Sequence, residues 1–296
     1  MRVANVAGRL ALIDERGAVD VETVSAGAFS PDPQAVFDRW DEFSRWAAAN
    51  ASAIAGSPTR DVDETQMEAP VPRPRQVFGI GLNYRDHAAE SGMALPEGDP
   101  VVFAKFVSSI VGPNAVVELP SESVDFEAEL VVVIGRRAHR VNCSDGWAHV
   151  AGVTVGQDLS ERRVQFRGPS PQFSLGKSYP GFSPIGPVVV TPDELPDRDA
   201  VELGCVLNGQ QMQKGRTDDF VFTVPELVES LSAVVTLLPG DLIFTGTPAG
   251  IGWARDPKVL LRPGDRLTTH AEVIGELTTT FTAPRPGPDR HRRRNP

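Results

Sequence analysis

One short segment, residues 125–134, constrains the fold of this chain more than any other. Residues 130–134 are apolar and rich in β-branched side chains, which predicts a buried strand. Because side chains two residues apart on a strand point to the same face, Glu127 and Glu129 place two carboxylates side by side at its start. Two like charges beside an apolar strand are costly unless a positive charge lies between them. A hard divalent cation would supply that charge; a solvated strand end, or pairing of the glutamates with nearby arginines, are the alternatives.

The composition excludes several classes of function. The net charge of -10 argues against a nucleic-acid partner, and an anionic substrate would need a local cation to hold it. Only Cys143 and Cys205 occur, so a disulfide framework and a cysteine-rich zinc site are not expected. The sequence contains neither the apolar core of a signal peptide nor a run of the roughly 18 apolar residues that span a bilayer. We therefore expect a cytoplasmic protein that does not enter a membrane.

The pattern of apolar residues predicts two domains and a tail. Residues 1–70 combine short strands at 3–7 and 9–13 with a helical period over 37–47, and end in a linker rich in proline, aspartate and threonine. They predict a small α/β domain whose aromatic side chains (Phe37, Trp40, Phe43 and Trp46) form core. Residues 71–284 alternate short apolar runs with turns and hold one amphipathic helix at 224–238, which predicts an α+β, mainly β domain. Residues 285–296 predict a disordered basic tail.

Six segments, taken in order over residues 74–280, resemble the fumarylacetoacetate hydrolase family. They are 79–90 (GIGLNYRDHAAE), 125–129 (DFEAE), 152–162 (GVTVGQDLSER), 176–178 (GKS), 208–209 (NG) and 244–252 (FTGTPAGIG). The first 70 residues are similar to the small domain of bacterial members, in the branch of acylpyruvases and 2-hydroxyhepta-2,4-diene-1,7-dioate isomerases. The resemblance implies a catalytic domain built as a mixed β-roll around a metal, in a homodimer.

The resemblance also implies a metal site. It makes Asp158 the third ligand beside Glu127 and Glu129, and three carboxylates with water form the oxygen-only shell that Mg²⁺ or Mn²⁺ prefers. With neither cysteine nor histidine at ligand spacing, zinc is not favoured. Without the resemblance, a helix cap or turn residue would be the preferred interpretation of Asp158.

Further residues match catalytic or substrate-binding positions of the family. His87 and Glu90 resemble a general-base dyad on a lid, since residues three apart share a helix face. Lys177, Gln165 and Thr247 match positions that contact substrate or developing charge. Lys105 lies in a strand-like run where its charge needs a partner, and we expect it to bind a substrate carboxylate. Arg162 is expected to support the ligands.

The resemblance implies a reaction on a small anionic keto acid. The first expectation is a divalent-metal-dependent hydrolase that cleaves the carbon–carbon bond of an acylpyruvate or β-diketo acid through a metal-stabilised enolate. Decarboxylation of a 2-oxo acid such as oxaloacetate, or isomerisation of a 2-hydroxy-dienoate, would use the same site. A non-catalytic metabolite-binding protein is a third alternative. Pro180 stands where family members often have aspartate, which leaves the substrate open.

Overall fold

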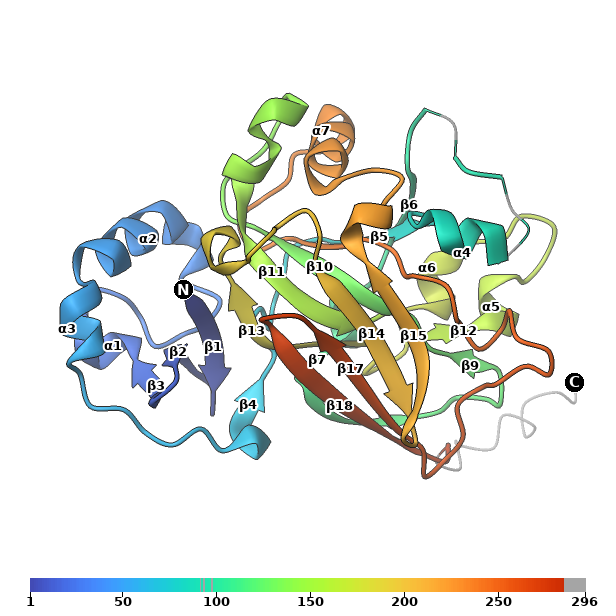
Figure 1. The fold of residues 1–296 in the computed structure, drawn as a ribbon, viewed down its shortest axis with the longest axis horizontal. Coiled ribbons are helices and arrows are strands. Elements are labelled where there is room, and N and C mark those ends of the chain that lie inside the picture. Colours follow the sequence, from blue (N-terminus) through green and yellow to red (C-terminus); the bar gives the residue numbers. More distant parts are fainter. Residues whose placement is uncertain (91, 93, 97, 285–296) are drawn as a thin grey trace, which may run out of the picture.

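The computed structural model describes residues 1–296 except 91, 93, 97 and 285–296, and Figure 1 shows its fold. The predicted basic tail lies outside the described residues, and the predicted lid lies partly outside them. No helix in the described part of the chain is both long enough and apolar enough to cross a bilayer.

A large mixed sheet organises the chain in the order β3-β2-β1-β13-β11-β10-β16-β5-β6, with β4 paired to β1 and β7 paired to β13. Its central strands β10 and β11 run antiparallel and are buried along their whole length, which confirms the buried strand predicted at residues 130–134. The strands are β1 (Arg2–Val6), β2 (Arg9–Asp14), β3 (Gly17–Asp20), β4 (Met67–Glu68), β5 (Val77–Gly81), β6 (Val101–Ala104), β7 (Ile110–Val111), β10 (Ala128–Ile134), β11 (Val150–Gln157), β13 (Ser183–Val190) and β16 (Leu242–Phe244).

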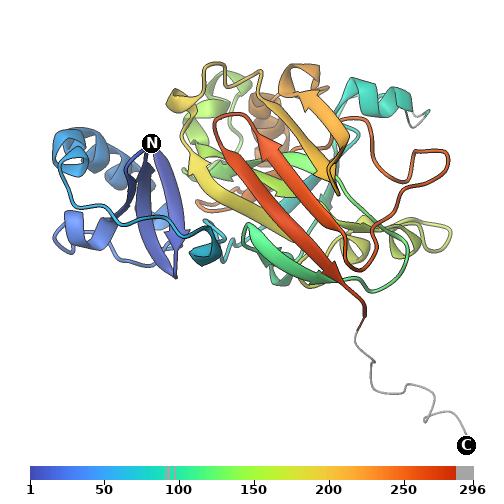
Figure 2. The same cartoon turned by 60° about the horizontal axis from the view of Figure 1, so that its bottom comes forward.

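A second sheet packs on the first and closes the roll, as Figure 2 shows. Its order is β15-β14-β17-β18-β8, and its strands β14, β17 and β18 contact β10, β11 and β13 of the large sheet. The strands are β8 (Asn114–Glu118), β14 (Glu202–Leu207), β15 (Gln210–Arg216), β17 (Arg266–Ala271) and β18 (Gly275–Thr282). A separate pair, β9 (Val124–Asp125) and β12 (Ser160–Glu161), lies beside the carboxylate residues. Two sheets with short helices at their edges form an α+β fold, as expected.

The helices are short and lie outside the two sheets. They are α1 (Val21–Val24), α2 (Trp40–Ala49), α3 (Ala51–Ala55), α4 (Arg85–Glu90), α5 (Arg162–Gln165), α6 (Phe173–Gly176) and α7 (Val224–Val234). Helix α7 begins at a capping box formed by Thr223 and Glu226, and ends four residues before the predicted 238 because Val235 is already extended. In α2, Trp40 and Phe43 are buried and the ring of Phe43 stacks on Trp46, which confirms the expectation that these aromatic side chains are core.

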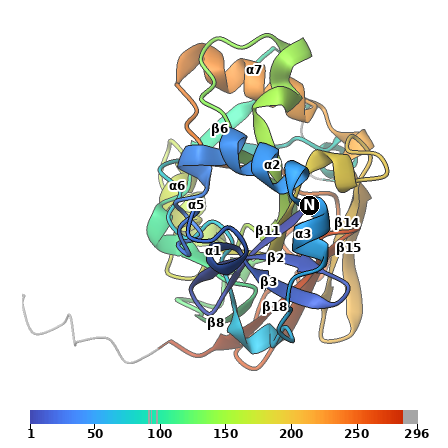
Figure 3. The same ribbon diagram turned by 90° about the vertical axis from the view of Figure 1, so that its left-hand side faces the viewer.

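The first 70 residues continue the large sheet. Strand β1 pairs antiparallel with β13, so that Val3 lies opposite Val189. Figure 1 shows the N-terminal strands beside the roll, and in Figure 3 they face the viewer in front of it. One hydrophobic cluster joins Val3, Leu10 and Phe43 to Val131 of β10. The boundary at residue 70 remains a prediction, but the two parts share backbone hydrogen bonds and core.

Candidate active site

Three carboxylates converge where β10 and β11 meet. Glu127 immediately precedes β10 and Glu129 lies in it, while Asp158 immediately follows β11. Because Ala128 pairs with Gln157, and the Asp158 amide donates to the Glu127 carbonyl at 2.9 Å, the ladder brings the third acid beside the first two. One oxygen from each carboxylate lies within 4.8 Å of the others, and all three residues are buried. The expected grouping of Glu127, Glu129 and Asp158 is therefore present.

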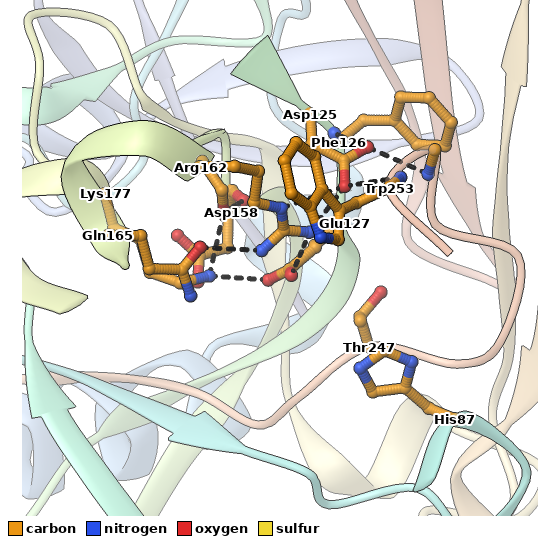
Figure 4. Close-up of polar contacts among 12 residues, drawn as sticks. His87, Asp125, Phe126, Glu127, Asp158, Arg162, Gln165, Lys177, Thr247 and Trp253 are labelled. Atoms are coloured by element: carbon orange, nitrogen blue, oxygen red, sulfur yellow. Dashed lines mark hydrogen bonds and ion pairs between the residues drawn. The ribbon is translucent and has the colours of Figure 1, made fainter. Parts of the chain in front are cut away.

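Three cations surround these acids, and Figure 4 shows two of them. The Lys177 ammonium donates to Glu127 Oε2 at 2.6 Å, to Asp158 Oδ2 at 2.5 Å and to Ser160 Oγ at 2.9 Å. Arg162 donates to Glu127 Oε1 at 2.8 Å and to Asp125 Oδ2 at 2.5 Å. The third cation, Lys105, donates to Asp158 and to the Lys177 carbonyl. Buried charges persist only when paired and hydrogen-bonded, so these contacts make the buried acids tolerable.

The two glutamates differ in their affinity for protons. Burial raises the pKa of Glu127, but the charges of Lys177 and Arg162 outweigh it and lower that pKa to about 2. Burial raises the pKa of Glu129 well above its usual range, and the charges of Asp158 and Glu127 raise it further. Burial opposes the charged form of Lys177, yet Asp158 and Glu127 raise its pKa. Of these two carboxylates, Glu129 is therefore the one whose surroundings favour the protonated form.

The donor set fits a hard divalent cation. All three groups offer oxygen, which Mg²⁺ and Mn²⁺ prefer, and the Gly246 amide orients Glu129 by donating to its Oε2 at 2.8 Å. Lys177 bridges Glu127 and Asp158, so its ammonium contacts two of the groups that such an ion would bind. A divalent ion or the Lys177 ammonium would each offset the repulsion between the neighbouring carboxylates. The pairing of Glu127 with an arginine, an alternative that the sequence left open, is present as well.

A cavity of about 530 Å³ opens beside the carboxylates. Its polar wall includes Glu127, Glu129, Arg162, Gln165, Lys177, Thr247, His87 and Glu90. Its apolar wall includes Val101, Phe103, Phe166, Phe173, Ile251 and Trp253. In Figure 4, His87 and Thr247 face the carboxylate side of this cavity. Most of the predicted site residues are thus brought to one space.

Two of the predicted residues lie behind the cavity wall. The side chains of Asp158 and Lys105 are fully buried and contact each other. Lys105 also donates to the carbonyls of Lys177 and Phe182, so its hydrogen bonds go to the protein. Its expected contact with a substrate carboxylate stays a prediction, while its observed contacts hold Asp158 in place.

His87 and Glu90 share one face of α4 without forming a hydrogen bond. The distance from His87 Nδ1 to Glu90 Oε2 is 3.7 Å, and Nδ1 has no hydrogen-bond partner among the described residues. The Glu90 carboxylate instead accepts from the Gly250 amide at 2.9 Å. The expected dyad is therefore close to assembled, with Glu90 held by the loop after β16.

Two other contacts fix the remaining polar residues. Thr247 Oγ1 donates to the Ala128 carbonyl at 2.9 Å and accepts from Gln213 Nε2 at 2.7 Å. Gln165 Oε1 accepts from Arg162 at 2.9 Å, which supports the expectation that Arg162 orients its neighbours. Pro180, which stands where family members often have aspartate, is exposed. Lys177 donates to the carboxylates of Glu127 and Asp158.

Sequence reasoning gave no role to Asp125 or Trp253. Asp125 has the same two-residue spacing from Glu127 that singled out Glu129, which was the available signal. Trp253 directly follows the matched segment 244–252, and its place in the cavity wall depends on a loop that no periodicity reveals.

A family model described as the C-terminal part of fumarylacetoacetate (FAA) hydrolase matches residues 76–282. The chain belongs to this family. A putative HpcE protein from Mycobacterium smegmatis has a crystal structure that superposes with a TM-score of 0.88 at 50% identity, covering 96% of this chain and 99% of that one. This similarity confirms the expected fold class.

Relatives within the family are named as enzymes with different activities. Human "Oxaloacetate tautomerase FAHD2A, mitochondrial" is 41% identical over 233 residues, which cover 78% of this chain and 74% of that protein. The maleylpyruvate hydrolase from Sphingobium sp. SYK-6, solved with manganese and pyruvate, is 27% identical with a TM-score of 0.77, and the match covers 96% of this chain and all of that one. Family membership therefore supports an enzyme with a divalent-metal site, while its members differ in reaction.

Proposed function

We propose that this protein is a divalent-metal-dependent tautomerase that interconverts the enol and keto forms of a small 2-oxo acid, with oxaloacetate as the first substrate to test. The observation that carries the proposal is one cavity lined by Glu127, Glu129 and a histidine, His87, whose Nδ1 has no hydrogen-bond partner among the described residues. Asp158 lies directly behind the wall and completes the oxygen-only triad. Relatives from human and cattle that are 41–43% identical and named oxaloacetate tautomerases support this choice of substrate.

Tautomerisation requires a proton to leave the 2-hydroxyl oxygen and a proton to reach carbon 3. A divalent ion held by Glu127, Glu129 and Asp158 would supply Lewis-acid stabilisation of the negative charge on the 2-oxygen. The buried Lys177 ammonium adds a fixed positive charge beside the same carboxylates. His87 is the group in the cavity wall suited to carry the proton to or from carbon 3, and Glu90 can orient its imidazole.

The test follows the enol of oxaloacetate by its ultraviolet absorbance. Metal-loaded protein is expected to speed the decay of the enol above the spontaneous rate, and EDTA is expected to remove the acceleration. His87→Ala should abolish it, whereas His149→Ala, at a half-buried histidine outside the cavity, should not. Decay at the spontaneous rate with wild-type protein and Mn²⁺ would refute the proposal.

Hydrolysis of acylpyruvates is the second candidate. The apolar wall of Phe103, Phe173 and Trp253 gives the cavity room and chemistry for an acyl chain that oxaloacetate lacks. In this reaction His87 would take a proton from the water that attacks the distal carbonyl. Product analysis separates the alternatives: pyruvate with a second carboxylic acid indicates hydrolysis, and carbon dioxide alone indicates decarboxylation. Ligand binding without turnover of any substrate would indicate a non-catalytic protein.

Assembly and location are also proposals. We infer a homodimer in the cytoplasm, although the human relative is named as mitochondrial. Light scattering of the purified protein tests the first inference, and fractionation of cells that express the chain tests the second.

A further inference from the structure

Asp125 is a buried carboxylate outside the proposed metal ligands. Its Oδ1 accepts from the Phe126 amide at 2.9 Å and from the Gly252 amide at 2.8 Å. Its Oδ2 accepts from the Trp253 amide at 3.0 Å and from Arg162, which also donates to Glu127. Both oxygens are therefore engaged, and Figure 4 shows Asp125 between Arg162 and Trp253.

The loop that Asp125 holds is also held by the helix of the dyad. The Ala249 amide donates to Asp86 Oδ1 at 3.2 Å, and the Gly250 amide donates to Glu90 Oε2 at 2.9 Å. Residues 249–253 thus offer backbone amides to α4 at one end and to Asp125 at the other. Through these bonds the loop connects the side of the cavity that carries His87 with the side that carries Glu127.

At Gly252 the loop backbone packs closely against Asp125 and Val259. A Cβ atom added there would lie 1.8 Å from the Val259 carbonyl oxygen and 2.6 Å from Asp125 Oδ1. Any side chain at this position must move the loop or the carboxylate. Glycine therefore allows the loop backbone to come within hydrogen-bond distance of Asp125.

We propose that Asp125 is a positioning residue. Through the backbone amides of residues 249–253, it fixes the position of His87 and Glu90 relative to the carboxylate triad. The inference rests on the proposed function in taking His87 as the proton carrier. Proton transfer requires the carrier within hydrogen-bond reach of the reacting carbon, and a displacement of about 1 Å can reduce the rate about 100-fold.

Asparagine at position 125 tests the connection because it preserves shape. An amide group has one acceptor oxygen and one NH₂ donor, so it can satisfy the donors on only one side of the carboxylate. Either Gly252 and Phe126, or Trp253 and Arg162, would face an NH₂ group. We expect Asp125→Asn to lower kcat by roughly 10- to 100-fold, with a smaller change in KM.

Two further variants keep the test independent of folding. Gly252→Ala displaces the loop and leaves the Asp125 charge for Arg162, so it should lower kcat in the same way. Asp241→Asn is the matched control, because Asp241 is another buried carboxylate that accepts from the Gln76 and Leu238 amides at 2.9 and 2.7 Å, outside the cavity wall. It should cost stability without changing kcat.

Hydrogen exchange reports on the loop without turnover. In Mg²⁺-loaded protein, amides of residues 249–253 should exchange at least about tenfold faster in Asp125→Asn and Gly252→Ala than in wild type or Asp241→Asn. The imidazole resonances of His87, identified by their loss in His87→Ala, should shift in the first two variants only. Unchanged exchange and unchanged resonances would overturn the proposal, even if the substrate had been chosen wrongly.

A double-mutant cycle with Glu90→Gln gives the kinetic test. If Asp125 acts through the loop on Glu90, the Asp125→Asn change should lower kcat much less in the Glu90→Gln protein than in wild type. Losses that multiply fully would mean independent action and would overturn the proposal. Wild-type protein that turns over no tested substrate would instead count against the proposed function, and exchange and His87 resonances would then decide the role of Asp125.

Discussion

Removal of the Lys177 ammonium is the sharpest test of the charge arrangement. We expect Lys177→Met to destabilise the metal-free protein, because Glu127 and Asp158 would each lose a buried partner at 2.5–2.6 Å. At an effective dielectric constant of 20, each contact corresponds to about 6 kcal/mol of Coulomb attraction before desolvation is counted. Measured costs of removing one partner of a buried pair are about 3–5 kcal/mol. Because Arg162 and Lys105 remain in place, we expect about 3 kcal/mol, the lower end of that range.

The assay is urea denaturation in EDTA, with Lys214→Met as the control. Lys214 is 58% exposed and lies 3.3 Å from Glu202, so its removal should change the free energy of unfolding by less than about 1 kcal/mol. Mn²⁺ should then stabilise Lys177→Met more than wild type, since the ion replaces the missing ammonium; binding at 100 times Kd contributes about 2.7 kcal/mol. The reasoning is refuted if the two methionine variants unfold at the same free energy in EDTA.

Three further predictions concern single residues of the site. Glu127→Ala should weaken Mn²⁺ binding by more than about 100-fold in a calorimetric titration; affinity within a few-fold of wild type would remove Glu127 from the ligand set. His87→Ala should keep that affinity but lower kcat about 10²- to 10⁴-fold in the enol assay, and normal turnover would exclude His87 as the proton carrier. The pKa of Glu129 is raised above its usual 4.5, so its contribution to the stability of the metal-free protein should be fully present below about pH 4.5 and be lost as the pH rises through the pKa of the folded state. Urea denaturation in EDTA at several pH values should show a smaller loss in Glu129→Gln, and an equal loss in both proteins would contradict the assignment.

Much of the site could be predicted because its residues lie in ordered motifs. The two-residue spacing of Glu127 and Glu129 places them on one face, and the resemblance supplies Asp158. The sequence predicts a supporting role for Arg162, but it does not predict the pairing of these acids with Lys105 and Lys177, because each lysine lies far along the chain from an acid that it contacts. Lys105 lies 53 residues from Asp158, and Lys177 lies 50 residues from Glu127. Neither period nor composition reveals such contacts.

The strands of the second sheet show a different limit on prediction from the sequence. In β18, Leu277, Thr279 and Phe281 are buried, while the residues between them are more exposed, so the period of two was present in the sequence. It was obscured because threonine occupies both faces and only two of the inward residues are apolar. A run of this kind becomes a strand through its partners β17 and β8, which lie elsewhere in the chain.

The buried charges of the site nearly balance one another without a metal ion. Asp125, Glu127, Glu129 and Asp158 face three buried cations, so the group carries one excess negative charge when every member is ionised. A proton on Glu129, whose pKa burial raises, removes that excess. A divalent ion bound by this triad would compete with a proton on Glu129 and share Glu127 and Asp158 with Lys177. We therefore expect cation binding at this triad to release a proton from Glu129 and to weaken as the pH falls.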